Sequence, residues 1–255
     1  MSPGAGAGSG SGFYDIAIEK GTDKVTIHSY QTMYERYLAP KRNRKHIKLL
    51  EIGLGCWMGA RNGRVGSAYH TWKEYFFNVD MYFIEQDPDC VQQWNKADGI
   101  NGGGATVVLG DPSDDLFMAD FKRQHARAST GGDFDVIVLS GGHTVAQQIK
   151  SLQSLWSTIR PGGVFFCEYL ETSYLGKFGG EVGANNSHKL TGKATMFRYL
   201  HEIMEDMMYP DPNLDIYQLK GAGVHWQKNV KFHEVESISH IDCAKQICAV
   251  SKRAD

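Results

Sequence analysis

A short glycine-containing segment after an apolar run is the first feature of the sequence that could support chemistry. It reads LLEIGLG at positions 49–55, with Glu51 two residues before Gly53 and Gly55 two residues after it. Glycines at the carboxyl end of a parallel strand let the backbone approach a ligand closely, because they carry no Cβ. The dinucleotide fingerprint GxGxxG fits imperfectly, since the next glycine, Gly59, comes one residue too late.

Acidic residues also follow the next two predicted strands. Glu85 ends the second one, where a carboxylate can accept both ribose hydroxyls of an adenosine cofactor. Asp87 precedes Pro88 and is expected only to cap a helix. Asp111 follows the third strand and could meet an adenine amino group or, equally, cap the helix at 114–126.

The E-x-G-x-G spacing is similar to that of class I S-adenosylmethionine (SAM) methyltransferases, in which the acid and the loop face the methionine part of the cofactor. With acids at three successive strand ends, this pattern favours SAM over NAD. An NAD-dependent oxidoreductase is the weaker alternative, because the sequence has no obvious Tyr-x-x-x-Lys pair for hydride transfer.

Strands and helices alternate along most of the chain, which indicates a parallel sheet covered on both faces. Strands are predicted at 48–52, 81–85, 106–109, 134–139 and 164–168, and helices at 66–77, 88–96, 114–126, 145–158 and 190–208. Two β-rich segments near the C-terminus predict an antiparallel hairpin that completes the sheet.

The N-terminal part has a different character. Residues 1–12 are expected to be a flexible tail, without the basic and apolar regions of a secretory signal. Apolar and aromatic positions from Ile27 to Leu38 follow helical spacing and predict an amphipathic helix that ends before Pro40. We therefore expect one domain over residues 13–255, with an N-terminal helical cap over about 13–47. The aromatic helix is a plausible homodimer surface.

Composition excludes several classes of protein. The 255 residues carry 27 Lys and Arg against 29 Asp and Glu, which argues against a dedicated nucleic-acid or membrane-surface protein. No apolar run approaches the roughly 20 residues of a membrane span. Five cysteines without a CxxC pair favour reduced thiols and a cytoplasmic location.

Longer motifs occur in a family-specific order. They are GTDK at 21–24, LLEIGLG, WKEYF at 72–76, GDPSD at 110–114, FDVIVLSGGH at 134–143, RPGG at 160–163, and E-x-L-x-TSY at 168–174 followed by FGG at 178–180. This order resembles the macrocin-type O-methyltransferases of macrolide sugars and related small fungal natural-product methyltransferases, over about residues 20–255. The resemblance implies a Rossmann-like class I methyltransferase fold with a mostly parallel seven-stranded sheet, SAM as methyl donor, and an oxygen acceptor on a small molecule.

One departure from this family concerns the metal. The bacterial enzymes carry an Asp-Asp pair after the fourth strand that holds magnesium, whereas Leu139 and Ser140 stand there in this sequence. Leucine offers no hard oxygen ligand, and Glu168 and Glu171 alone would make a poor Mg²⁺ site. We therefore expect a metal-independent enzyme.

Without a metal, the acceptor should be more acidic than a sugar hydroxyl. A carboxylate is already ionised at pH 7, and a phenol can be activated by one positioned histidine. His143 is the candidate general base, or it orients a carboxylate acceptor; the alternative is a helix-capping or core histidine. The expected product is thus a methyl ester or ether. The competing hypothesis is a protein of this fold that does not methylate, and that keeps SAM as a structural cofactor or acts as a scaffold.

The resemblance suggests further contacts. Thr22, Lys24 and Ser140 are expected to contact the cofactor, in addition to the candidates Glu51, Gly53, Gly55, Glu85 and Asp111 named above. The residues expected to contact the acceptor are His28, Tyr30, Glu168, Tyr174, Phe178 and Gly179. For Thr22, Lys24, His28 and Tyr30, the alternative is that their side chains only pack within the N-terminal helical segment. For residues 174–180, a surface loop competes with a lid over an apolar acceptor.

Overall fold

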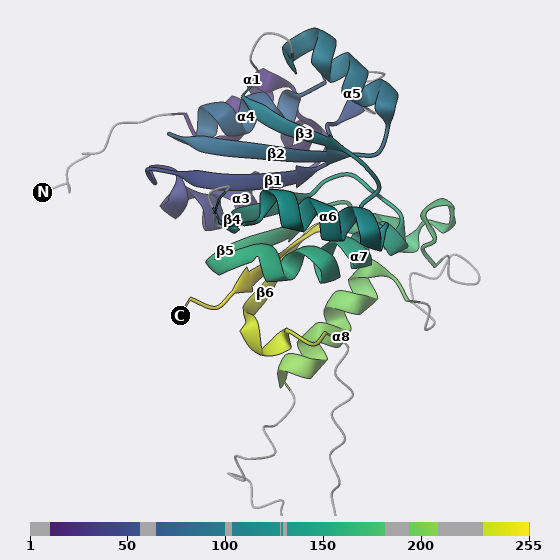
Figure 1. Ribbon diagram of the computed structural model, residues 1–255. Coiled ribbons are helices and arrows are strands. Elements are labelled where there is room, and N and C mark those ends of the chain that lie inside the picture. Colours follow the sequence, from purple (N-terminus) through teal and green to yellow (C-terminus); the bar gives the residue numbers. More distant parts are fainter. Residues whose placement is uncertain are drawn as a thin grey trace, which may run out of the picture. The chain divides into compact units, whose positions relative to one another are not determined.

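The computed structural model describes residues 11–56, 65–99, 104–127, 129, 132–181, 194–208 and 232–254 (Figure 1). Most of the predicted tail, and Gly59 of the imperfect dinucleotide pattern, lie outside these residues. The chain forms two compact units, residues 1–109 and 110–255. The prediction of one domain over residues 13–255 stays a prediction.

The first unit contains three parallel strands with β2 in the middle. They are β1 (Ile47–Ile52), β2 (Val79–Glu85) and β3 (Ala105–Leu109). All residues of β1 are buried, as expected for a strand covered on both faces. The helices that follow β1 and β2 are α4 (Ser67–Tyr75) and α5 (Pro88–Trp94), the latter continuing into a π-helical turn (Asn95–Gly99).

The N-terminal segment folds as several short helices instead of one. They are α1 (Phe13–Lys20), α2 (Asp23–Thr26), α3 (Gln31–Leu38) and the 3₁₀ turn η1 (Ala39–Lys41). The predicted start of the helix at Ile27 is wrong: this side chain is 55% exposed and lies between α2 and α3. The Phe13 ring instead packs on Tyr34, Trp72 and Tyr75, with ring centroids 4.8, 5.2 and 5.5 Å away. This aromatic cluster attaches α1 to α3 and α4.

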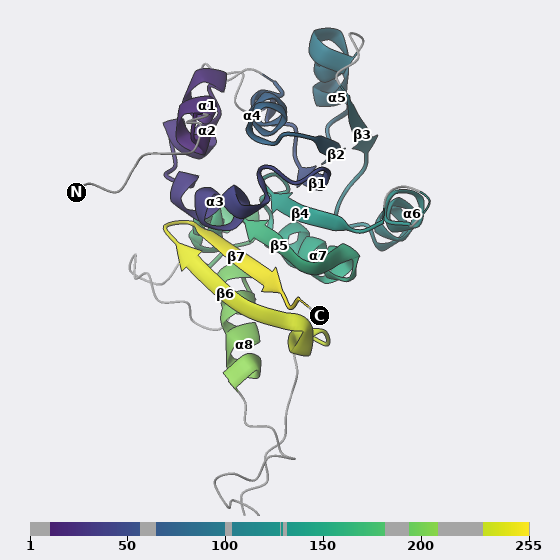
Figure 2. The same ribbon diagram turned by 90° about the vertical axis from the view of Figure 1, so that its left-hand side faces the viewer.

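The second unit contains two parallel strands followed by an antiparallel hairpin. The strands are β4 (Phe134–Leu139), β5 (Ile159–Cys167), β6 (Ile238–Ala244) and β7 (Ile247–Lys252). β7 lies between β5 and β6 and is antiparallel to both (Figure 2). The helices are α6 (Asp115–His125), α7 (Val145–Leu155) and α8 (Met196–Met208), with 3₁₀ turns η5 (Trp156–Thr158), η6 (Leu170–Tyr174), η7 (Gly176–Phe178) and η9 (Val235–Ser237).

The strand order is β3-β2-β1-β4-β5-β7-β6, which confirms the predicted seven-stranded, mostly parallel sheet with a C-terminal antiparallel hairpin. The predicted bounds of β4 are those observed, and the others differ by a few residues. β5 begins at Ile159 and not at 164, because the strand accommodates Pro161 and Gly162 with a register shift against β4. No helix in the described part of the chain is long and apolar enough to cross a membrane.

The prediction of reduced cysteines is wrong for four of the five. Disulfides join Cys56 to Cys90 and Cys243 to Cys248, and only Cys167 has a free thiol. The spacing in sequence gave no sign of this pairing. Cys56 and Cys90 follow neighbouring strands, whereas Cys243 and Cys248 are directly opposite in the β6–β7 hairpin.

Candidate functional site

In the first unit, Lys24 and Glu51 meet in a buried ion pair. Lys24 Nζ lies 3.0 Å from Glu51 Oε1, and both side chains are 1% exposed. The Trp72 indole N–H donates to the other carboxylate oxygen at 2.6 Å. Thr22 caps α2, which carries Lys24. The cofactor contacts predicted for these residues stay predictions. The structure shows that the buried charges of Lys24 and Glu51 compensate each other, two residues before Gly53 in the chain.

The glycine segment after β1 turns sharply at both glycines. Gly53 has φ 101° and Gly55 has φ 76°, in the region that residues with a Cβ rarely adopt. The Gly53 N–H donates to the carbonyl of Ile84 at 2.8 Å, which fixes the start of the turn against β2. Among the residues that the structure describes, none has an atom within 4 Å of a Cβ built on Gly55, so these residues leave the space beside this backbone open.

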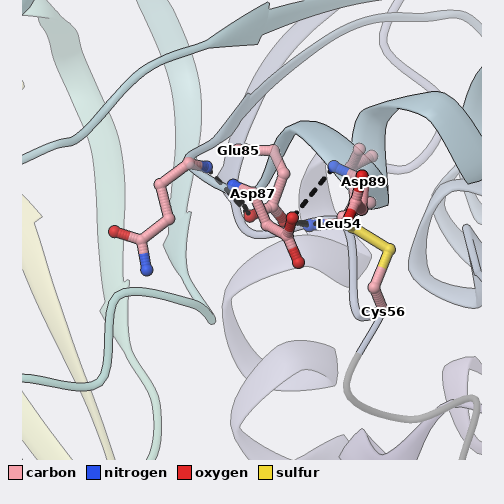
Figure 3. The surroundings of a disulfide bond; sticks show 7 residues. Leu54, Cys56, Glu85, Asp87 and Asp89 are labelled. Carbon is pink, nitrogen blue, oxygen red and sulfur yellow. Dashed lines mark hydrogen bonds between the residues drawn. A yellow bond between two sulfur atoms is a disulfide. The ribbon is translucent and has the colours of Figure 1, made fainter.

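Glu85 ends β2, as predicted, and its carboxylate lies beside this turn and accepts several backbone N–H groups (Figure 3). Oε2 accepts the Leu54 N–H at 2.9 Å, and Oε1 accepts those of Gln86 and Asp87 at 2.9 and 3.0 Å. The side chain is half-buried, so the carboxylate is partly accessible. Glu85 therefore connects the ends of β1 and β2.

Asp87 and Asp111 follow adjacent strands and have different roles. Asp87 caps α5 by accepting the Asp89 N–H at 2.9 Å, as predicted. Asp111 does not cap α6, a role that Asp114 takes. Partial burial acts to raise the pKa of Asp111, but hydrogen bonds from Ser113 and Gln147 lower the pKa overall. Asp111 is thus held as a carboxylate at the start of the second unit.

In the second unit, the His143 ring contacts two aromatic rings. Its ring centroid is 4.7 Å from that of Tyr169, at an interplanar angle of 77°, and 5.8 Å from that of Phe178, at 62°. All three side chains are half-buried. Thr144 and not His143 caps α7, so the capping alternative for this histidine is wrong. Ser140, predicted to touch cofactor, is half-buried at the end of β4.

Tyr169 is a candidate site residue that the sequence reasoning missed. It has φ 56° and ψ 38°, an uncommon conformation for a residue with a bulky side chain. Its carbonyl accepts both the N–H and the hydroxyl of Thr172, at 2.9 and 2.8 Å. Nothing in the local sequence signals this turn. Glu168, just before it, is fully buried and was predicted to touch the acceptor.

The segment predicted to be a lid packs closely on η6. The Gly180 N–H donates to Leu175 at 3.1 Å, and a Cβ on Gly180 would lie 2.3 Å from the Thr172 carbonyl oxygen. Gly179 has φ 81°, and Tyr174 at the end of η6 is half-buried. The structure therefore brings Phe178 next to His143 through a tight, glycine-dependent turn. Whether the segment contacts an acceptor stays a prediction.

The remaining acceptor candidates lie in the first unit. The rings of His28 and Tyr30 stack at 4.7 Å with an interplanar angle of 9°. Tyr30 is fully buried at the start of α3, which agrees with the packing alternative, whereas His28 is half-buried.

Leu139, the position where the bacterial enzymes carry an acid, is 1% exposed within β4. Among the residues that the structure describes, no three His, Cys, Asp or Glu side chains are grouped so that they could hold a metal ion.

Comparison with known proteins confirms the resemblance. No model of a protein family matches the sequence. An 8-demethyl-8-alpha-L-rhamnosyl tetracenomycin-C 2'-O-methyltransferase of Streptomyces olivaceus is 28% identical over 66% of this chain and 40% of its own length. Mycinamicin VI 2''-O-methyltransferase of Micromonospora griseorubida is 24% identical over 82% of this chain and 48% of its own length. Demethylmacrocin O-methyltransferase of Streptomyces fradiae is 25% identical over 64% of this chain and 37% of its own length. The chain thus spans half or less of these relatives.

Among solved structures, the MycE methyltransferase in complex with Mg, SAH and mycinamycin VI superposes with a TM-score of 0.71. The two chains are 18% identical, and the match covers 96% of this chain and 55% of MycE. At this identity the likeness shows the fold, and it confirms the predicted Rossmann-like methyltransferase architecture.

Proposed function

We propose that this protein is a SAM-dependent O-methyltransferase that acts on a small natural product. The observation that carries the proposal is Glu85, a half-buried carboxylate that accepts the N–H of Leu54 from the glycine turn of β1. A strand-end carboxylate beside a glycine turn is how folds of this type receive the ribose of an adenosine cofactor. The names of the curated relatives support methyl transfer to oxygen.

The residues around this turn fit such a cofactor. No described residue fills the space of a Cβ on Gly55, which lets the backbone approach a ligand there, and Glu85 can accept ribose hydroxyls. Glu51, two residues before Gly53, has its charge compensated by the ion pair with Lys24. When bound, SAM supplies an electrophilic methyl group on a sulfonium. The chain's task is to hold an acceptor oxygen in line with that methyl group.

For the acceptor, we propose a carboxylate or a phenol, with His143 as base or orienting group. The half-buried rings of Tyr169 and Phe178 beside His143 suit a flat apolar acceptor. A phenol proton would pass to an imidazole nitrogen of His143, whereas a carboxylate would need only orientation. We further propose that no metal takes part, because Leu139 and Ser140 replace the acidic pair, although the MycE structures contain Mg. We also propose that the enzyme has no nucleic-acid or membrane partner and that it forms a homodimer. The cytoplasmic location predicted from reduced cysteines loses its basis, because four of the five cysteines form disulfides.

Titration calorimetry with S-adenosylhomocysteine (SAH) tests the cofactor site. We expect binding to the unmodified protein, and a loss of at least tenfold in affinity for Glu85→Ala, because the ribose loses its acceptor. Asp120→Ala, which removes an exposed carboxylate of α6, is the matched control and should bind SAH normally. Absence of binding at millimolar SAH would exclude the proposal.

Methyl transfer from labelled SAM to a panel of aromatic acids, phenols and glycosides, followed by mass spectrometry, tests the acceptor and the metal. We expect labelled esters or aryl ethers, at a rate indifferent to EDTA, and a fall of about 10²–10⁴-fold in His143→Gln for a phenol. Activity that EDTA abolishes and Mg²⁺ restores would contradict metal independence. SAH binding without any transfer would favour the non-methylating alternative.

A further inference from the structure

The Cys56–Cys90 disulfide crosses between the two segments that carry the proposed cofactor residues. Cys56 directly follows Gly55 of the glycine turn, and Cys90 lies in α5, five residues after Glu85. The strands that lead into these segments are parallel neighbours, with Ile52 in register with Ile84. The disulfide, with a Cα–Cα distance of 5.6 Å, thus links the strand ends covalently where backbone hydrogen bonding between β1 and β2 stops.

The disulfide lies directly against the Glu85 carboxylate (Figure 3). Cys90 Sγ is 3.5 Å from Glu85 Oε2, the same oxygen that accepts the Leu54 N–H at 2.9 Å. Cys90 is 1% exposed, and Cys56 is half-buried. One carboxylate oxygen is therefore in contact with both the glycine turn and the disulfide.

We propose that Cys56 and Cys90 are positioning residues of the cofactor site, and that their disulfide holds the Leu54 N–H on Glu85 so that the turn is pre-formed for the cofactor. This inference rests on the proposed function. A pre-formed turn raises affinity because less chain entropy is lost on binding. The oxidised sulfur of Cys90 also has no hydrogen to donate, so Glu85 Oε2 stays available to ribose.

Reduction changes both features. A dithiol such as dithiothreitol transfers two electrons and two protons, so that the S–S bond becomes two thiols and the reductant becomes its own cyclic disulfide. The turn then loses its tether. The new Cys90 S–H can donate to Glu85 Oε2 and so compete with both Leu54 and ribose. SAH affinity should therefore depend on the redox state of this one pair.

The experiment is SAH titration of the oxidised and the dithiothreitol-reduced protein, with the thiols counted by alkylation and mass spectrometry. We expect reduction to weaken SAH binding about tenfold, and the Cys56→Ser/Cys90→Ser variant to bind weakly with and without reductant. Cys243→Ser/Cys248→Ser removes the hairpin disulfide and is the matched control: it should bind SAH like the unmodified protein and keep the response to reductant. Equal SAH affinity in both redox states would overturn the inference.

Two further measurements separate positioning from general stability. In Glu85→Gln, reduction should change SAH affinity less than twofold, because the carboxylate through which the disulfide acts is gone. Without any ligand, reduction should speed hydrogen exchange of the Leu54 amide and leave that of Gly53, bonded to Ile84, unchanged. An undiminished redox effect in Glu85→Gln, or equal acceleration of both amides, would contradict a positioning role. Absence of SAH binding in both redox states would instead refute the proposed function itself.

Discussion

At the scale of single residues, Tyr169 has a backbone conformation that its side chain does not favour. Tyr169 adopts φ 56°, which is unfavourable by about 1–2 kcal/mol for a residue with a Cβ. Its carbonyl is bonded twice to Thr172, and its ring stands against His143. Strain of this kind persists where the surrounding structure determines the backbone, and it is common at functional sites.

This backbone conformation predicts that a glycine variant at position 169 is more stable than an alanine variant, the reverse of the usual order within a helix. Tyr169→Gly and Tyr169→Ala both remove the ring, but glycine accepts the positive φ, so the Gly variant should be more stable by about 1 kcal/mol. The free energies of unfolding in urea check this. At the exposed helical residue Ala119, Ala119→Gly should instead destabilise by about 1 kcal/mol. If the Ala variant at 169 is the more stable of the pair, the strain argument fails.

Among the elements, α7 connects the His143 segment to Asp111. A capping box starts the helix: Thr144 Oγ1 accepts the Gln147 N–H at 3.3 Å, and the Gln147 side chain accepts the Thr144 N–H at 3.4 Å. The amide of Gln147 also donates to Asp111 at 3.4 Å. The first turn of α7 therefore fixes the chain immediately after His143.

Removing this cap should lower stability measurably. We expect Thr144→Ala to reduce the free energy of unfolding by about 1 kcal/mol, because the Gln147 N–H loses its acceptor. Thr144→Ser keeps the hydroxyl and should lie close to the unmodified protein in the same urea titration. An equal loss in both variants would show that the threonine methyl group, and not the capping hydrogen bond, is responsible.

At the scale of the whole molecule, the five cysteines form two covalent cross-links and leave one free thiol. Four of them form two disulfides, one after the β1 and β2 strand ends and one in the β6–β7 hairpin. Cys167 lies at the end of β5 with no exposed surface, and burial raises the pKa of its thiol. A buried thiol that resists ionisation is unreactive in the folded protein.

The number of cysteines that react with iodoacetamide should therefore change in steps. We expect none in the native protein, one in the unfolded protein without reductant, and five in the unfolded protein after reduction. Intact-mass spectrometry reads each count directly. Three or more alkylated cysteines in the unfolded, unreduced protein would show that a disulfide is missing.

The sequence by itself determined the strands, most of the helices and the residues at the strand ends. Continuous apolar runs, glycines and caps act over a few residues, so β4 and the positions of Gly53, Gly55 and Glu85 could be located from local pattern alone. The N-terminal helix starting at Ile27 was misplaced, because helical spacing does not show which side chains find a partner to pack against.

Only the tertiary structure decided which distant side chains meet. The ion pair of Lys24 with Glu51, the Cys56–Cys90 disulfide and the Tyr169 ring against His143 each join residues 26 or more positions apart. No local period encodes such contacts. The disulfide and the His143–Tyr169 contact arise where parallel strands bring their carboxyl ends to one edge of a sheet, whereas the ion pair joins α2 to β1. The glycine turn was thus readable from seven residues, whereas the disulfide beside it depended on the packing of β1 against β2.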